Sequence, residues 1–237
     1  MKPLIPKQHG AWAMLVIPFA LGVIAGEPSW LHIPLFIGWL FLYLATYSLL
    51  MAVKGKQVNH YLRWTLIYGG LAGVSLILPI LEIGKITYFG FAMIPFLFIN
   101  ALYSKRNKER ALFNDLCAIA AFGIGGLTSY YVGTGKLDQT AFMVWGFSML
   151  FFIGSTFYVK TMIRERNNAV YRWVSWGYHL LLLAGCWLVG LPLLALAYAP
   201  SAVRAIGLYG KNVSAVKVGV LEIANSIYFM IVLLFFF

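Results

Sequence analysis

Two polar side chains with useful chemistry stand inside long apolar runs of this 237-residue chain. His179 has Ser175 one helical turn before it, and Glu222 has Asn225 and Ser226 one turn after it. A polar group inside an apolar run is costly to bury, so such residues are candidates for function. An imidazole and a carboxylate at these positions could relay protons or neutralise a bound ion.

Each of these two residues also has a purely structural interpretation. No ionisable partner lies within one turn of His179, which favours a hydrogen-bonded packing histidine over a proton relay. Glu222 requires a cation close to it, such as Lys217 or Arg204. The sequence therefore predicts an ion pair at Glu222.

Basic and polar residues form a second candidate group at the ends of the apolar runs. Lys54 follows Tyr43 and Tyr47 on one helical stripe, and Arg164 follows Lys160 by one turn. Guanidinium and ammonium groups bind phosphate oxygens directly, which predicts a basic, tyrosine-lined mouth. The alternative is an interfacial belt of tyrosines with snorkelling basic residues. The candidate ligand-binding residues are His9, Tyr47, Lys54, Asn100, Tyr103, Lys105, Arg106, Asn114, Asp115, Lys160, Arg164 and Glu165.

The carboxylates do not cluster, and no His-x-x-x-His or Asp-x-x-x-Asp pattern occurs. On the side of the predicted bundle where the basic residues lie, the acidic residues are only Glu109, Asp115, Glu165 and Glu222. Magnesium requires clustered oxygen ligands and zinc requires closely spaced histidines or cysteines. The sequence predicts no metal site and no cofactor.

The composition decides what kind of element positions these residues. The chain is 62% hydrophobic and 11% charged, with a mean hydropathy of +0.83. A soluble domain is roughly a quarter charged. This excludes a soluble enzyme, a disordered chain and a disulfide-stapled secreted module. Cys117 and Cys186 each lie in an apolar run and are predicted to be core residues.

The apolar runs predict an all-α fold: a polytopic membrane bundle of about nine transmembrane helices, forming one membrane domain over residues 1–237. A spanning helix needs about 20 mostly apolar residues. The seventh and eighth runs are divided only by Gly190, Leu191 and Pro192. The predicted spans are 10–26, 30–53, 61–82, 87–103, 111–134, 140–162, 172–189, 190–206 and 216–237.

The basic residues predict the orientation of these spans. The chain has 18 lysines and arginines and a net charge of +11. With a cytoplasmic N-terminus and nine spans, all of them except Lys85 and Lys136 fall at cytoplasmic segments. Eight spans would instead place Arg204, Lys211 and Lys217 outside. We therefore expect the basic residues to orient the chain, with the C-terminus outside, and to contact anionic lipid heads. The positive net charge does not indicate nucleic-acid binding.

Three stretches resemble the bacterial YwiC-like membrane proteins: residues 6–15 (PKQHGAWAML), 103–115 (YSKRNKERALFND) and 158–166 (YVKTMIRER). The resemblance covers nearly the whole chain and implies a bacterial plasma-membrane protein. It does not imply a particular activity.

The chain also distantly resembles the UbiA-type intramembrane prenyltransferases, which have nine spans and an inner-facing active site. Their Tyr-Pro-x-x-Lys-Arg stretch is echoed here by Tyr103, Lys105 and Arg106, with a shorter spacing. Their two Asp-rich motifs correspond to residues 47–54 (YSLLMAVK) and 158–165 (YVKTMIRE), where no aspartate occurs. The departure argues against magnesium-assisted ionisation of an isoprenyl diphosphate.

Three functions follow from these features. The first is a UbiA-like bundle that binds an isoprenoid or other anionic amphiphile at its cytoplasmic mouth, with catalysis left open. The second is a small proton-coupled transporter using His179 and Glu222, in which prolines and glycines inside the spans break helices near a site. The third is a non-catalytic membrane scaffold or accessory protein, for which Gly125 and Gly126 would provide a helix-packing face. The lipid bilayer is the one partner common to all three.

Overall fold

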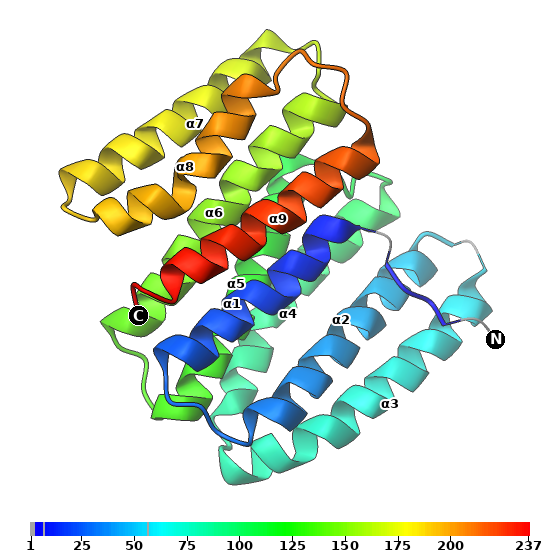
Figure 1. Ribbon diagram of the computed structural model, residues 1–237. Coiled ribbons are helices and arrows are strands. Elements are labelled where there is room, and N and C mark those ends of the chain that lie inside the picture. Colours follow the sequence, from blue (N-terminus) through cyan, green and yellow to red (C-terminus); the bar gives the residue numbers. More distant parts are fainter. Residues whose placement is uncertain (1–2, 7, 56) are drawn as a thin grey trace. The chain divides into compact units, whose positions relative to one another are not determined.

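The computed structural model describes residues 3–6, 8–55 and 57–237, and in these residues all regular structure is helical (Figure 1). Each helix coincides with one predicted apolar run to within a few residues at either end. The predicted all-α class is therefore confirmed. The helices are α1 His9–Ala25, α2 His32–Val53, α3 Val58–Glu82, α4 Ile86–Lys105, α5 Leu112–Thr134, α6 Gln139–Ile163, α7 Ala169–Leu188, α8 Pro192–Gly207 and α9 Ala215–Leu233.

Helices α2, α3, α4, α5, α6 and α9 are long and apolar enough to cross a membrane. The chain is thus a polytopic helical membrane bundle. Helix α1 is shorter, and α8, with 16 residues, reaches only about 24 Å against about 30 Å of hydrocarbon. The break between α7 and α8 lies where the sequence predicts it. Gly190 has a φ of +75° and Pro192 occupies the first turn of α8, a position where its missing N–H is no loss.

Prolines inside the apolar runs do not break the helices that contain them. Pro18, Pro79 and Pro95 lie within α1, α3 and α4, and each of these helices continues on both sides of its proline. The described helices therefore continue through these prolines.

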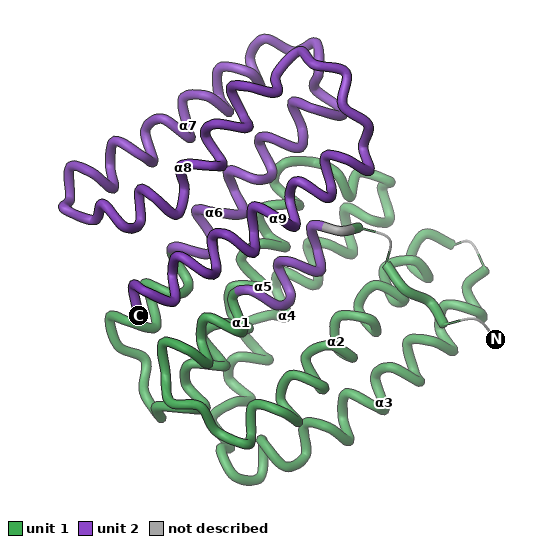
Figure 2. The backbone as a smooth tube through the Cα atoms, viewed as in Figure 1, with its two compact units in different colours: residues 1–8, 18–146 green, residues 9–17, 147–237 purple. Residues whose placement is uncertain are grey.

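The chain forms two compact units (Figure 2). Unit 1 contains residues 1–8 and 18–146, and unit 2 contains residues 9–17 and 147–237. Both α1 and α6 contribute to each unit. A single membrane domain over residues 1–237 stays a prediction.

Close backbone packing holds the centre of unit 1. A methyl group added at Gly126 of α5 would lie 2.7 Å from the carbonyl oxygen of Pro18 in α1. One added at Gly22 would meet the Gly126 carbonyl in the same way. Next to this contact, the Ser129 hydroxyl donates to the Phe19 carbonyl at 2.9 Å. Small residues let two membrane helices approach closely and gain packing contacts.

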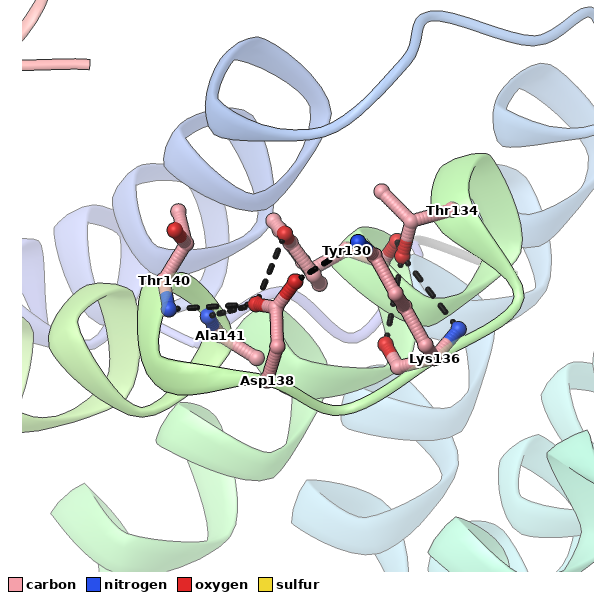
Figure 3. Close-up of polar contacts among 6 residues, drawn as sticks. All are labelled: Tyr130, Thr134, Lys136, Asp138, Thr140 and Ala141. Carbon is pink, nitrogen blue, oxygen red and sulfur yellow. Dashed lines mark hydrogen bonds and ion pairs between the residues drawn. The ribbon is translucent and has the colours of Figure 1, made fainter.

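A polar turn joins α5 to α6 in unit 1 (Figure 3). Asp138 accepts hydrogen bonds from the Tyr130 hydroxyl at 2.9 Å and from the backbone N–H groups of Thr140 and Ala141. Its second carboxylate oxygen lies 3.1 Å from Lys136 Nζ. The Tyr130 hydrogen bond and the Lys136 contact together hold the pKa of Asp138 below its ordinary value. Asp138 therefore caps the first turn of α6.

An aromatic stack fills the core of unit 2. Phe151 of α6 and Phe229 of α9 lie face to face with ring centroids 4.1 Å apart, and Tyr198 of α8 stacks on Phe229 at 5.5 Å. The Tyr198 hydroxyl donates to the Phe147 carbonyl at 2.9 Å, which satisfies its polar end. The stack fixes α6, α8 and α9 against one another.

Candidate functional site

The loops between α6 and α7 and between α8 and α9 lie at the same end of unit 2. Arg166 Nη1 donates to Asn212 Oδ1 at 3.1 Å, and the Tyr209 hydroxyl lies 3.5 Å from the Arg166 carbonyl oxygen. We call residues 164–168 and 208–214 the loop end. Helices α6 and α8 end there, and α7 and α9 begin there.

A buried ion pair lies just inside the loop end. Arg204 Nη1 of α8 contacts one carboxylate oxygen of Glu222 of α9, and the Ser155 hydroxyl of α6 donates to the other. Arg204 is 8% exposed and Glu222 is 4% exposed. At 1.5 Å per residue, Arg204 lies about 5 Å from the end of α8 and Glu222 about 10 Å from the start of α9. The cation that Glu222 was predicted to require is therefore Arg204, whereas Lys217 is exposed.

The guanidinium of Arg204 has binding capacity that the ion pair does not use. Its carbon lies 4.5 Å above the ring of Tyr158, a fully buried residue of α6. Among the described residues, Arg204 Nε, Arg204 Nη2 and the Tyr158 hydroxyl are buried and have no hydrogen-bond partner. A buried polar group left unmatched costs about 1–3 kcal/mol. Three such groups on one arginine–tyrosine pair indicate a site for an external acceptor.

His179 of α7 supplies an acceptor to the same region. Its Nδ1 lies 2.7 Å from the Ser175 carbonyl oxygen, which can only accept, so Nδ1 is the donor. In the neutral ring Nε2 is a lone-pair acceptor, and it has no partner in the described part of the chain. It faces Gly154 of α6, where an added methyl group would lie 3.1 Å from it. The glycine leaves the space that the imidazole occupies.

One helical turn beyond Glu222 in α9, Asn225 Nδ2 donates to the Ser201 hydroxyl of α8 at 2.9 Å. The side-chain oxygen Oδ1 of Asn225 is buried and has no partner among the described residues. Four helices thus contribute polar side chains to one buried group, which we call the polar cluster. Its members are Ser155, Tyr158, Ser175, His179, Ser201, Arg204, Glu222 and Asn225.

The polar cluster offers N–H and O–H donors beside one carboxylate and one imidazole lone pair. This set suits an oxyanion, which accepts from a guanidinium and a phenol. Within the described residues, no three His, Cys, Asp or Glu side chains come together in a way that could hold a metal ion.

In unit 1, the predicted ligand Lys54 is already engaged. Its Nζ lies 2.6 Å from Glu109 Oε1, and Asn114 Nδ2 donates to the Glu109 carbonyl at 2.7 Å. Burial alone would raise the pKa of Glu109, but the Lys54 hydrogen bond and the charges of Lys54 and Arg110 bring it below its ordinary value. This group joins the end of α2 to the α4–α5 loop and neutralises the charge of Lys54.

Asn100 and Tyr103 make structural contacts in unit 1. Asn100 Nδ2 donates to the carbonyl of Phe96 in its own helix at 2.7 Å, and the Tyr103 ring lies 6.2 Å from that of Phe113. These two residues therefore tie α4 to itself and to the start of α5.

The other predicted residues of unit 1 are spread over three helices. Lys105 and Arg106 are exposed at the end of α4. Tyr47 is half-buried in α2, and Asp115 lies in the first turn of α5. Their role in one shared ligand site stays a prediction.

Four predicted residues belong to unit 2. Lys160 is buried in α6 and is 7% exposed. Arg164 is exposed at the loop end, and Glu165 accepts from Asn168 Nδ2 at 2.9 Å. His9 begins α1, but its side chain lies outside the described part of the chain.

The ligand-binding prediction therefore missed the residues that form the polar cluster. Glu222 and His179 carried a signal, since each is polar inside an apolar run, and Arg204 was expected only as a counter-ion for Glu222. Tyr158 and Ser155 carried no signal beyond residue type. The structure also confirms that Cys117 and Cys186 are buried free thiols.

Comparison with known proteins identifies the family. The chain is 44% identical over 236 residues to the YwiC protein of Bacillus subtilis (strain 168), covering 100% of this chain and 99% of that one. It is 41% identical over 238 residues to a protein of Haemophilus influenzae (strain ATCC 51907 / DSM 11121 / KW20 / Rd), covering 99% and 98%. No solved structure matches, so the likeness to UbiA-type prenyltransferases stays a prediction. Residues 5–130 match the family described as YwiC-like protein, and the chain belongs to that family.

Proposed function

We propose that this membrane protein binds the oxyanion head of an isoprenoid or other anionic amphiphile at the polar cluster, with Arg204 as the principal ligand. One observation carries the proposal. The Arg204 guanidinium is buried, pairs with Glu222 through Nη1 alone, and has two further nitrogens without partners among the described residues.

The geometry of a guanidinium supports an oxyanion ligand. A guanidinium presents five N–H donors in a fixed fork that matches two oxygens of a phosphate or carboxylate. Such charge-assisted pairs are stronger than neutral hydrogen bonds. The Tyr158 ring lies against the guanidinium, and its unpartnered hydroxyl is a further neutral donor in the same residue pair.

The position of the polar cluster supports an amphiphile as the carrier of that oxyanion. Arg204 and Glu222 lie about 5–10 Å inside the helix ends, at the depth where lipid head groups give way to hydrocarbon. Basic residues around the loop end, such as Arg166, Arg172 and Lys211, would attract anionic heads. We propose that the loop end faces the cytoplasm of a bacterial plasma membrane, as the distribution of basic residues predicts.

Binding, rather than metal-assisted chemistry, is proposed. The stretches that correspond to the Asp-rich motifs of UbiA-type enzymes contain no aspartate. A diphosphate held by arginine and tyrosine alone would lack the divalent ion that neutralises a leaving diphosphate in those enzymes.

The test compares a polyprenyl phosphate with the corresponding neutral polyprenol, bound to the full chain in nanodiscs and measured by native mass spectrometry. Wild type should prefer the phosphate, and R204Q should lose at least tenfold in affinity for it. The double variant R204Q/E222Q, which leaves no uncompensated buried charge, should lose it equally. R63Q, at an exposed arginine of α3, is the matched control. Binding of the phosphate to R204Q/E222Q as tightly as to wild type would overturn the proposal.

A proton-coupled transporter is the second candidate. It is favoured by the presence of both His179 and Glu222 in the polar cluster. Two titratable groups beside an arginine inside a membrane are an arrangement that proton-coupled transporters use. Proton-driven flux of an anion into proteoliposomes, abolished in E222Q, would support this function over simple binding.

A further inference from the structure

We propose that Glu222 is the internal occupant of the oxyanion site, and that an incoming oxyanion displaces its carboxylate from Arg204 while Glu222 takes up one proton. This inference rests on the proposed function and deepens it. The ligand is a phosphate- or carboxylate-type oxyanion, carried by a lipid head or free in solution.

The contacts of Glu222 support an exchange. Its carboxylate oxygens are held by Arg204 Nη1 of α8 and by the Ser155 hydroxyl of α6. An oxyanion that takes the guanidinium with two oxygens must approach Nη2 and either Nε or Nη1. Binding through Nε and Nη2 would leave Glu222 in place and add a second anion to the buried site, whereas binding through Nη1 and Nη2 removes the present contact of Glu222.

The charges around Glu222 make simple addition of an anion unfavourable. Arg204 contributes one positive charge, Tyr158 of α6 is a neutral phenol, and His179 of α7 bonds as a neutral imidazole. Lys160 lies two residues beyond Tyr158 on α6, so it projects from another side of that helix. Lys217, on α9 itself, is exposed. Two anions would therefore share one buried cation at low dielectric.

Protonation of Glu222 removes this repulsion. A carboxylic acid is neutral, so Arg204 and the oxyanion remain as a balanced pair. Ser155 suits both states, because a hydroxyl donates to a carboxylate and accepts from a carboxylic acid. The step forms the O–H bond of the Glu222 carboxylic acid and breaks an O–H bond of the solvent acid, hydronium or buffer, that supplies the proton at the loop end. Both changes are reversed when the oxyanion leaves.

The experiment uses dihexadecyl phosphate, a diester that stays monoanionic, so that only the protein titrates between pH 5.5 and 8.5. Affinity for wild type should fall about tenfold per pH unit, as the uptake of one proton requires. The affinity of E222Q should be the same at every pH and should equal that of wild type at pH 5.5. H179Q should keep the slope of wild type. An equal slope in E222Q, or none in wild type, would overturn the inference.

A second measurement does not depend on the stability of any variant. A pH-indicator dye in weak buffer should report the uptake of one proton when wild type binds dihexadecyl phosphate, and no uptake would overturn the inference. Competition by dimethyl phosphate would identify a free anion as the source, and its failure would identify a lipid head. If R204Q/E222Q binds the diester like wild type, the proposed function fails as well. If R204Q/E222Q loses binding but the affinity of wild type does not depend on pH, the proposed function stands and only the displacement of Glu222 is overturned.

Discussion

The two units each contain an ion pair between chain segments, and the two pairs differ in burial and in what surrounds them. In unit 1, the Lys54 and Glu109 side chains are 19% and 31% exposed. In unit 2, the Arg204 and Glu222 side chains are 9% and 5% exposed, and Ser155 and Tyr158 lie against them. A half-buried pair can exchange its partner for water more easily than a buried pair can.

The difference separates two kinds of packing. Unit 1 is held by close helix backbones around Gly22 and Gly126, and the Thr128 and Ser129 hydroxyls donate to nearby backbone carbonyls. Gly22 and Gly126 contact neighbouring backbone inside the unit, so they do not offer the exposed packing face that a scaffold function would use. Both units bury polar side-chain atoms without partners among the described residues, such as Asn114 Oδ1 in unit 1, but in unit 2 three of these atoms belong to the contacting residues Arg204 and Tyr158. Unmatched atoms of this kind lower stability, and a bound acceptor would restore the missing hydrogen bonds.

The largest expected effect is on the buried pair. Removing Glu222 alone by E222L, or Arg204 alone by R204Q, leaves one uncompensated charge and should lower the free energy of unfolding by about 3–5 kcal/mol. The double variant R204Q/E222Q should recover more than half of this loss. Denaturant unfolding in detergent measures all three. Single variants as stable as wild type would show that the pair is solvated and would end the contrast between the units.

The next effect tests the framework of unit 1. G126A places a methyl group 2.7 Å from the Pro18 carbonyl oxygen and should destabilise the protein by about 1–3 kcal/mol through overpacking. G70A in α3, where nothing lies within 4 Å of the added methyl, is the control and should be neutral or slightly stabilising. Thermal unfolding in detergent compares the two. Equal melting of G126A and G70A would contradict close packing in unit 1.

A smaller effect is expected at the half-buried pair of unit 1, Lys54 and Glu109. E109Q should change the free energy of unfolding by less than about 1 kcal/mol. Because the pKa of Glu109 is lowered from 4.5, its contribution is complete above that value and is lost as the pH falls below it. Melting temperatures of wild type and E109Q should therefore converge in acid. E109Q also tests the prediction that Lys54 is a ligand-binding residue. If E109Q binds polyprenyl phosphate more tightly than wild type, Lys54 can act as a ligand once Glu109 no longer pairs with it.

The smallest effect is expected at the α5–α6 turn. The pKa of Asp138 is lowered from 3.8, so the stability that its carboxylate contributes is present above that value and disappears as the pH falls below it. D138N keeps the shape of the cap and removes this acid dependence. A melting curve recorded against pH checks it, with K136Q as a control that keeps the Tyr130 and backbone bonds. Identical acid dependence in D138N would exclude the cap as its source.

The helices themselves were predictable from the sequence because a membrane helix needs a continuous apolar run, and such a run is visible in one dimension. The break at Gly190 and Pro192 was also predictable, since a positive φ and a missing N–H are local properties. Pro79 and Pro95 lie in helices that continue past them, and a single missing hydrogen bond does not end such a helix when its neighbours stabilise it.

The site was only partly predictable. His179 and Glu222 were recognisable as candidates because they are polar residues in apolar runs. The basic residues at the helix ends were stronger candidates for ligand binding because lysine and arginine bind phosphate. Lys54 illustrates the difficulty. Its value as a ligand depended on Glu109, 55 positions away, and the sequence could not reveal the 2.6 Å contact that joins them.

The sequence by itself determined that the chain is a bundle of apolar helices, where these helices begin and end, and that Glu222 needs a cation. Hydrophobicity, helix-breaking geometry and the expense of a buried charge are properties of single residues and their neighbours. Only the tertiary structure decided that Arg204 is this cation and that Tyr158, Ser155 and His179 surround the pair. The contacts of Glu222 join residues of α6, α8 and α9 that are 18 and 67 positions apart in the chain, and their positions follow from packing in three dimensions.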